Sequence, residues 1–186
     1  MKGGGGTLLA ALLAAALFTP LFLTGGAGAF DFWWWLTANN LLLFALAARL
    51  DRRYLSRLAA DLREGAAGKV VLGLLSAAAL YLLFWAGNHL SRLLLPGAGG
   101  EIESIYGLKD GVAVWRVALL MAFVIGPGEE LFWRAFLQHR LMAALGRWRG
   151  LAAGALLYAG VHLASGNLML VAAALVCGLA WGGLYL

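Results

Sequence analysis

The stretch KVVLGLLSAAALYLLFWAGNHL, residues 69–90, contains no Asp, Glu, Lys or Arg after its first residue. An α-helix of about 20 apolar residues is long enough to cross the roughly 30 Å hydrocarbon core of a bilayer. Further apolar runs lie on both sides of this stretch, at 7–23, 30–50, 112–144, 151–163 and 168–186. We therefore predict an all-α fold, a polytopic transmembrane helical bundle with about six spans.

The composition agrees with a chain surrounded by lipid. Hydrophobic residues make up 63% of the 186 residues, charged residues make up 12%, and the mean hydropathy is +0.85. A water-soluble globular domain of ordinary composition is much less apolar. The six runs leave no room for a separate soluble domain, so residues 1–186 are predicted to form a single membrane domain.

The basic residues flank the apolar runs, where they indicate topology. Six cations lie at positions 49 to 69, at the facing ends of the second and third runs and between them, and Arg140, Arg147 and Arg149 lie near the junction of the fourth and fifth. Both loops are predicted to be cytoplasmic, with both termini inside. We therefore attribute the net charge of +5 to cations that flank membrane spans. The expected partner is the lipid bilayer, and we expect no nucleic acid partner.

The N-terminus allows two interpretations. Lys2, the apolar run 7–23 and the small residues Ala27, Gly28 and Ala29 fit either a first span or a cleavable signal peptide. Cleavage would leave the predicted topology of the later runs unchanged.

Two adjacent carboxylates, Glu129 and Glu130, lie inside the fourth run. Ionisable residues within a membrane span are costly, so they normally face the protein interior, find a partner and mark a functional path. They follow Gly126-Pro127-Gly128, which we expect to interrupt the helix because Pro removes a backbone donor and clashes with the preceding turn. The carboxylates are then predicted to lie at the start of a new half-helix.

The two glutamates point in different directions and so differ in role. Glu130 and Arg134 are four residues apart on one helix face, which predicts an ion pair. Glu129 has no evident local partner and is suited to act as a general base. The alternative for the Glu130–Arg134 pair by itself is a buried contact that fixes two helices.

His162, in the fifth run, lies at a similar depth to Glu129. Counting from the turn near Trp148, two antiparallel helices would place these residues about 7 Å apart along the membrane normal. A lone histidine in an apolar helix can also be a packing residue. Asn167 is predicted to be a helix N-cap, and Asn88 and His89 are predicted to face an interface rather than take part in chemistry.

Glu129-Glu130-x-x-x-Arg134 followed by Tyr158-x-x-x-His162 resembles the first two motifs of the CPBP intramembrane peptidases, the family of CAAX proteases and bacteriocin-processing proteins. The resemblance extends from about Gly126 to the end of the chain. It divides the domain into N-terminal spans, 1–111, and a peptidase-like core, 112–186.

This resemblance implies an intramembrane endopeptidase. In such an enzyme Glu129 activates a water, Glu130 and Arg134 organise the site, and His162 assists. The implied substrate is a membrane-anchored protein or peptide, cleaved near its membrane-embedded C-terminal tail. The stretches Phe132-Trp133-Arg134 and His162 to Asn167 resemble those of bacterial members that process C-terminal sorting signals, which predicts a multi-pass protein of the bacterial inner membrane.

The family pattern continues to a further helix with a second His and a polar partner, whereas this sequence stops at Leu186. We therefore expect the core to be truncated at its C-terminus and the fragment to be inactive or nearly so.

No cofactor is expected, since the chain has no His-Glu-x-x-His helix. If the enzyme were metal-dependent, Glu129 and His162 would be the ligands of a divalent ion such as zinc. Two other classes compete with the peptidase: a non-catalytic scaffold or immunity-type membrane protein that uses the Glu130–Arg134 pair structurally, and a transporter. No internal repeat supports the transporter.

Overall fold

The computed structural model describes residues 4–27 and 30–186 and confirms the all-α prediction. The N-terminal helices are α1 (Gly4–Thr24), α2 (Phe32–Leu50), α3 (Tyr54–Arg63), α4 (Ala66–Leu94) and α5 (Ala98–Gly107). The C-terminal helices are α6 (Val114–Leu120), α7 (Gly126–Glu129), α8 (His139–Leu145), α9 (Arg147–Val161) and α10 (Leu168–Leu184). Two π-helical segments, η1 (Met121–Ile125) and η2 (Glu130–Gln138), and a 3₁₀ turn, η3 (His162–Ser165), complete the helical structure.

The only strands among the described residues form a short antiparallel pair between α1 and α2, β1 (Gly26–Ala27) and β2 (Phe30–Asp31). Residues 28 and 29 of the possible signal-peptide cleavage site lie outside the described residues, so the choice between span and signal peptide stays open.

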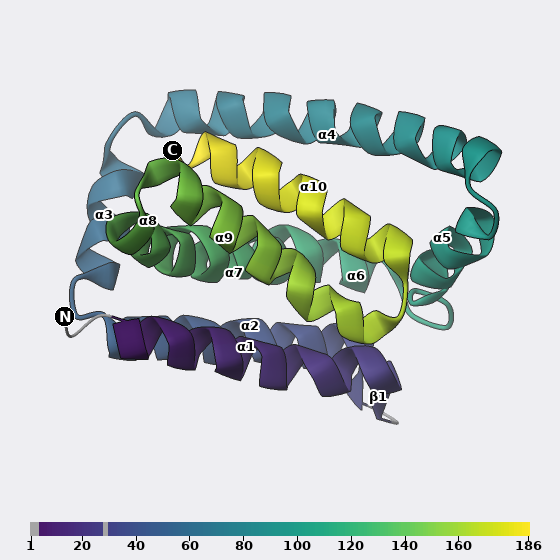
Figure 1. Cartoon of the computed structure of the whole chain (residues 1–186), viewed down its shortest axis with the longest axis horizontal. Coiled ribbons are helices and arrows are strands. Elements are labelled where there is room, and N and C mark those ends of the chain that lie inside the picture. Colours follow the sequence, from purple (N-terminus) through teal and green to yellow (C-terminus); the bar gives the residue numbers. More distant parts are fainter. Residues whose placement is uncertain (1–3, 28–29) are drawn as a thin grey trace.

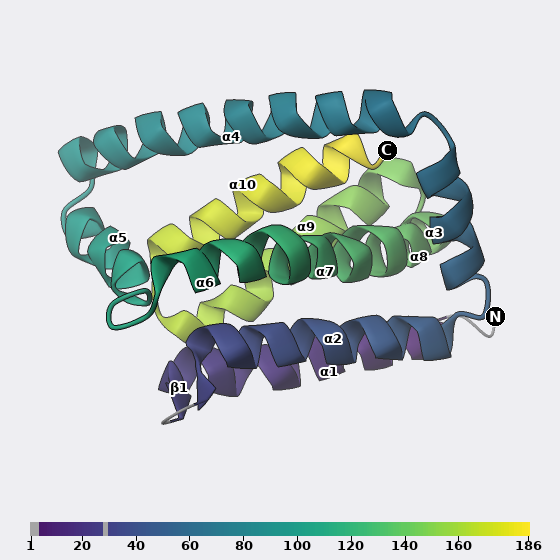
Figure 2. The ribbon, with the colours of Figure 1, turned by 180° about the vertical axis from the view of Figure 1, so that it is seen from behind.

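The long helices run roughly along one direction in three layers (Figures 1 and 2). The pair α1 and α2 covers one side, α4 covers the opposite side, and the run α6 to α8 lies between them with α9 and α10. The short helices α3 and α5 lie at opposite ends of the bundle. α1 contributes one buried face, in which Ala10, Ala14, Phe18 and Leu21 are all 0% exposed, at the three- and four-residue spacing of a helix stripe.

Two helices of the described part are long and apolar enough to cross a membrane, α1 and α4, and α10 is a shorter apolar helix. In α4 only Leu80 is buried, although leucines, valines and aromatic residues cover most of its surface. Such an apolar helix suits contact with lipid. Membrane association is therefore supported, whereas six spans stay a prediction.

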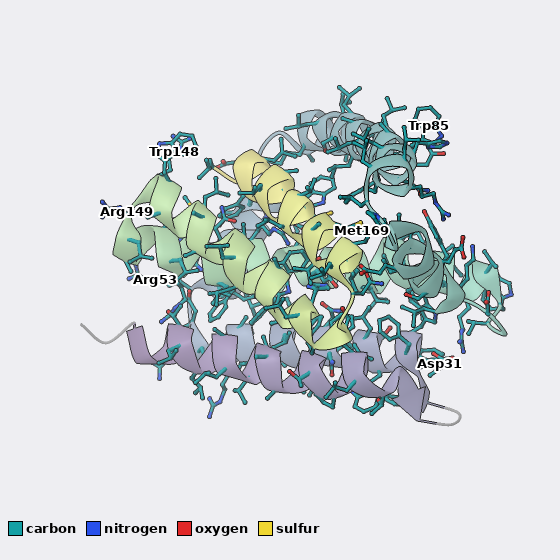
Figure 3. The ribbon with its side chains drawn as sticks, turned by 45° about the vertical axis from the view of Figure 1, so that its right-hand side comes forward. Asp31, Arg53, Trp85, Trp148, Arg149 and Met169 are labelled. Carbon is teal, nitrogen blue, oxygen red and sulfur yellow. The ribbon has the colours of Figure 1, made fainter. Side chains whose placement is uncertain are left out.

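The ends of the bundle differ in charge. Arg53 and Arg149 lie at one end, and Asp31 lies at the other (Figure 3). At the basic end, Arg57 pairs with Asp51 at 2.8 Å. Burial raises the pKa of Asp51, but hydrogen bonds from the Arg57 side chain and the Arg53 N–H outweigh burial and hold this pKa below its usual 3.8.

The predicted break at Gly126-Pro127-Gly128 is wrong, because the fourth run is helical without interruption from Val114 to Leu145. The Gly126 N–H bonds to the Met121 carbonyl, five residues back. This wider turn precedes Pro127. It makes room for the proline ring, which would crowd an ordinary α-turn and has no N–H to donate. Glu129 and Glu130 therefore do not lie at a free helix N-terminus.

Two glycines allow α8 and α9 to pack closely against each other. Gly146, with φ +88°, ends α8 and turns the chain directly into α9. A Cβ atom on Gly150 would lie 2.5 Å from the backbone of Met142, so α8 and α9 meet with almost no space between them. This tight turn brings α9 back along η2, the segment that carries Glu130 and Arg134.

Candidate active site

Arg134 links three helices at the centre of the bundle. Its Nη1 lies 3.0 Å from Glu130 Oε1, so the predicted ion pair is present. Its Nη2 donates to the carbonyl of Cys177 in α10 at 3.0 Å, and its guanidinium lies 4.6 Å from the centre of the Tyr158 ring. The Arg134 side chain is 4% exposed and that of Glu130 is 40% exposed, so the cation is the buried partner.

Glu129 has a partner that the sequence reasoning missed. The Tyr158 hydroxyl donates to Glu129 Oε2 at 2.5 Å, from α9 to α7. Tyr158 is 8% exposed, and a buried tyrosine hydroxyl requires an acceptor. The sequence contains a signal for this contact, since Tyr158 belongs to the same motif as His162, but residue spacing alone does not show that its hydroxyl reaches the carboxylate.

His162 is buried at 6% exposure, at the point where α9 tightens into η3. Its Nδ1 lies 2.8 Å from the Tyr158 carbonyl oxygen. Because a carbonyl can only accept, Nδ1 carries the proton, and in the neutral ring Nε2 is left as an acceptor. The rings of Phe18 and Phe22 in α1 and of Tyr158 pack around the imidazole, with centroids 5.0 to 6.1 Å away.

Tyr158 thus brings the four predicted site residues together. It contacts Glu129 through its hydroxyl, Arg134 through its ring face and His162 through both its carbonyl and its ring. Glu130 joins the group through Arg134. The arrangement holds a carboxylate, a guanidinium and an imidazole in one apolar interior, which is a set of groups that can move a proton and stabilise charge.

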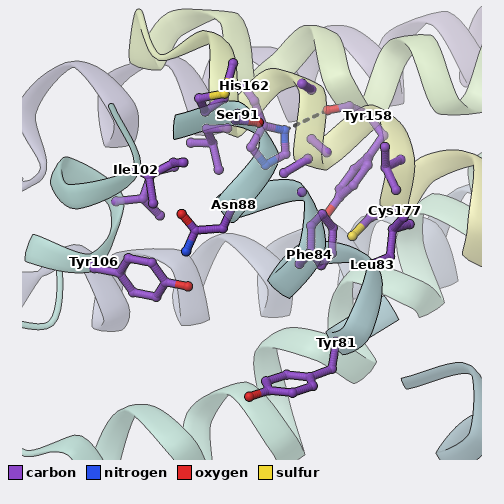
Figure 4. Close-up of a pocket in the computed structure, with 18 residues that line it drawn as sticks. Tyr81, Leu83, Phe84, Asn88, Ser91, Ile102, Tyr106, Tyr158, His162 and Cys177 are labelled. Carbon is purple, nitrogen blue, oxygen red and sulfur yellow. Dashed lines mark hydrogen bonds between the residues drawn. The ribbon is translucent and has the colours of Figure 1, made fainter. Parts of the chain in front are cut away.

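A cavity of about 630 Å³ on the side of α4 reaches Tyr158 and His162, whereas Glu129, Glu130 and Arg134 do not line it (Figure 4). Side chains from α4, α5, α9 and α10 line it, and Tyr158 and His162 lie at its inner wall. Most of the lining is apolar, from Leu83, Phe84 and Ile102 to the alanines of α10. An apolar pocket with few polar groups is typical of a ligand site.

Asn167 positions α10, as its predicted role of N-cap requires. Its Oδ1 accepts from the Leu170 N–H at 2.8 Å, and its Nδ2 donates to Glu101 O and Ser104 Oγ of α5. The two residues predicted to face an interface differ from each other. His89 is exposed, with Nδ1 at 2.8 Å from the Trp85 carbonyl, whereas Asn88 lines the cavity.

Within residues 4–27 and 30–186, no three His, Cys, Asp or Glu side chains come together in a way that could hold a metal ion. The pair Glu129 and His162 would supply two side chains, whereas catalytic zinc sites use three protein ligands. These residues alone therefore fit a zinc site poorly.

The Glu129 carboxylate and the His162 imidazole thus lie among apolar helices, close to an apolar cavity. Residues 111–186 match the family model described as "Rce1-like: Type II CAAX prenyl endopeptidase Rce1-like", so this stretch is similar to a family of membrane proteases. The predicted resemblance to the CPBP peptidases is confirmed at this level, while the sorting-signal subgroup stays a prediction. No curated protein and no solved structure gave a significant match.

Proposed function

We propose that the protein is a multi-pass intramembrane endopeptidase of the bacterial inner membrane. It hydrolyses a peptide bond near the membrane-embedded C-terminal tail of a membrane-anchored protein, with Glu129 activating the water. The hydrogen bond between Tyr158 and Glu129, next to the buried Arg134, is the observation that carries this proposal.

In the proposed reaction, Glu129 Oε1 takes a proton from a water while Oε2 is held by Tyr158. The water oxygen bonds to the carbonyl carbon of the scissile peptide, and the carbonyl π electrons move onto its oxygen. When the C=O bond re-forms, the C–N bond breaks and the leaving nitrogen takes the proton from Glu129. Arg134 provides positive charge close to the reaction, and His162 Nε2 accepts a hydrogen bond from the water or the substrate.

The apolar cavity supports a substrate with an apolar tail. The family's name refers to prenylated CAAX ends, whereas the motifs of this chain favour the tail of an exported protein. A prenylated CAAX peptide and a transmembrane peptide with a C-terminal tail, offered in the same vesicles, distinguish the two. We expect faster cleavage of the transmembrane peptide.

Glu129→Gln tests the proposal in the protein expressed from its complete reading frame, which includes any segment beyond Leu186. We expect cleavage to fall by about 10²–10⁴-fold, because this is the typical contribution of a general base. Membrane insertion should be unchanged. The matched control is Glu64→Gln, which makes the same substitution at an exposed glutamate between α3 and α4. This variant should leave cleavage unchanged.

Cleavage by Glu129→Gln at the rate of the unmodified protein would reject the peptidase proposal. A chelator such as 1,10-phenanthroline should have no effect. If the chelator abolished cleavage and added zinc restored it, the metal-free mechanism would be wrong, and Glu129 and His162 would become candidate ligands.

The competing function is a non-catalytic scaffold. It is favoured by one observation, that Arg134 joins Glu130 to the backbone of Cys177 and so ties η2 to α10. In that case Glu130→Gln would lower thermal stability, and no substitution at Glu129 would affect processing of any substrate.

A further inference from the structure

A second cavity, of about 620 Å³, lies between α1 and the helices α8 and α9, and it shares no lining residue with the cavity at Tyr158. Among the described residues that line it, Arg140 has the only charged side chain and Thr7 has the only hydroxyl. We call this cavity the α1–α8 groove, because several of its lining side chains are exposed. Its walls are otherwise apolar and include Leu8, Ala11, Ala144 and Leu157.

Arg140 is fixed beside the start of α1. Its Nε donates to Thr7 Oγ1 at 2.9 Å, and its Cζ lies 5.4 Å from the centre of the Phe136 ring. A Cβ atom on Gly6 would lie 3.5 Å from Arg140 Nη2, so the guanidinium is next to the first turn of α1. A cation already held in place loses less conformational entropy when it binds an anion.

The length of α1 sets the depth of this cation in the membrane. Its 21 residues rise about 31 Å, which matches a hydrocarbon core of about 30 Å. With α1 as a span, its first turn and the Arg140 guanidinium lie at the edge of this core. Trp148 is 69% exposed at the same end of the bundle, as is typical of the membrane interface (Figure 3). Arg140 is therefore at the height of the lipid phosphates.

The surroundings of the groove favour a negative ligand. Arg147 and Arg149 begin α9 at this end, which is predicted to be cytoplasmic, and the cytoplasmic leaflet contains anionic lipids. Asp51 is close enough to interact with Arg140 through its charge, but it already pairs with Arg57 at 2.8 Å. Charge complementarity therefore favours an anionic headgroup over a zwitterionic one.

We propose that the α1–α8 groove binds one anionic phospholipid of the cytoplasmic leaflet, with its phosphate on Arg140 and an acyl chain along the apolar walls. A guanidinium binds phosphate oxygens through N–H groups in a planar fork, which the ammonium of a lysine does not offer. The apolar walls take the chain, since they continue from the level of Arg140 toward the middle of the membrane. This site requires α1 to be a span and does not depend on the peptidase function.

Arg140→Gln tests the headgroup contact. Binding of phosphatidylglycerol and of phosphatidylcholine with the same acyl chains is measured by native mass spectrometry of the full chain in detergent. We expect the unmodified protein to bind phosphatidylglycerol at least 5-fold more tightly, the factor that corresponds to about 1 kcal/mol for one cation near an anionic lipid surface. Arg140→Gln should remove this preference. Equal binding of the two lipids by the unmodified protein would overturn the inference.

Arg52→Gln is the matched control for charge. Arg52 is exposed in the turn between α2 and α3, at the same end of the bundle and outside the groove. This variant should keep the preference for phosphatidylglycerol. If the two variants lost it equally, the preference would come from the total charge of this end, and the proposed site would be wrong.

Ala144→Phe tests the apolar part of the groove and leaves the bond between Arg140 and Thr7 intact, so it also covers the case in which Arg140→Gln is unstable. The phenyl ring should occupy the space of the acyl chain and weaken binding of phosphatidylglycerol by at least 5-fold. The control is Ala16→Phe, at an exposed alanine of α1 outside the groove. Equal binding by these two variants would show that no chain lies in the groove.

A free anion separates a lipid site from a simple phosphate site. In thermal unfolding of the full chain, a short-chain phosphatidylglycerol should raise Tm, and inorganic phosphate at the same concentration should not. Equal stabilisation by inorganic phosphate would overturn the inference, because the apolar walls would then contribute nothing to binding.

Discussion

At the scale of single residues, one aromatic side chain organises the candidate site. Tyr158 contacts Glu129, Arg134 and His162, each through a different part of its structure. Its hydroxyl donates to Glu129 Oε2, and in the proposed reaction Oε1 takes the proton from the water. Because this hydrogen bond comes from the neighbouring helix α9, it fixes the direction of the Glu129 carboxylate.

Tyr158→Phe should lower kcat/KM by about 10- to 100-fold, because a hydrogen bond to a charged group contributes ~1.5–3 kcal/mol. The ring contacts with Arg134 and His162 would persist, so thermal stability should change little. The pH profile of kcat/KM should be displaced, which a purely structural role would not produce. Tyr106→Phe is the control, since Tyr106 lines the same cavity without a hydrogen bond from its hydroxyl among the described residues. Equal activity in the two variants would contradict the role given to Tyr158.

At the scale of helices, the sequence predicted where the helical runs lie but not how they turn. The apolar runs and the Glu130–Arg134 spacing depend on local periodicity, so both could be read from sequence. The wide turns around Pro127 could not, because an α-turn and a π-turn leave the same apolar pattern. The contact between Tyr158 and Glu129 depends on how α9 is rotated against α7, which is set by packing distant in sequence.

The crossing of α8 and α9 gives a prediction at this scale. Gly150→Ala should destabilise the protein by about 1–3 kcal/mol, because the new Cβ would lie 2.5 Å from the Met142 backbone, which cannot move aside as a side chain can. Gly160→Ala is the matched control in the same helix, since nothing lies within 4 Å of its added Cβ. Thermal unfolding in detergent measures both. A Gly150→Ala variant as stable as Gly160→Ala would mean that the two helices are not so close.

At the scale of the whole molecule, the uneven charge of the two ends predicts an orientation in the membrane. Arg53 and Arg149 lie at one end of the bundle and Asp31 at the other (Figure 3). Loops rich in Lys and Arg stay on the cytoplasmic side, so the end with α3 should face the cytoplasm. The turn between α5 and α6, which contains Asp110, should then face outward.

Cysteine labelling tests this orientation in a Cys177→Ser background. Arg53→Cys and Asp110→Cys both place a thiol at an exposed position. A membrane-impermeant maleimide added to intact cells should label Asp110→Cys and should label Arg53→Cys only after lysis. The reverse pattern would invert the predicted orientation of the protein. Labelling of both in intact cells would be incompatible with α4 crossing the membrane, and α4 would then lie along its surface.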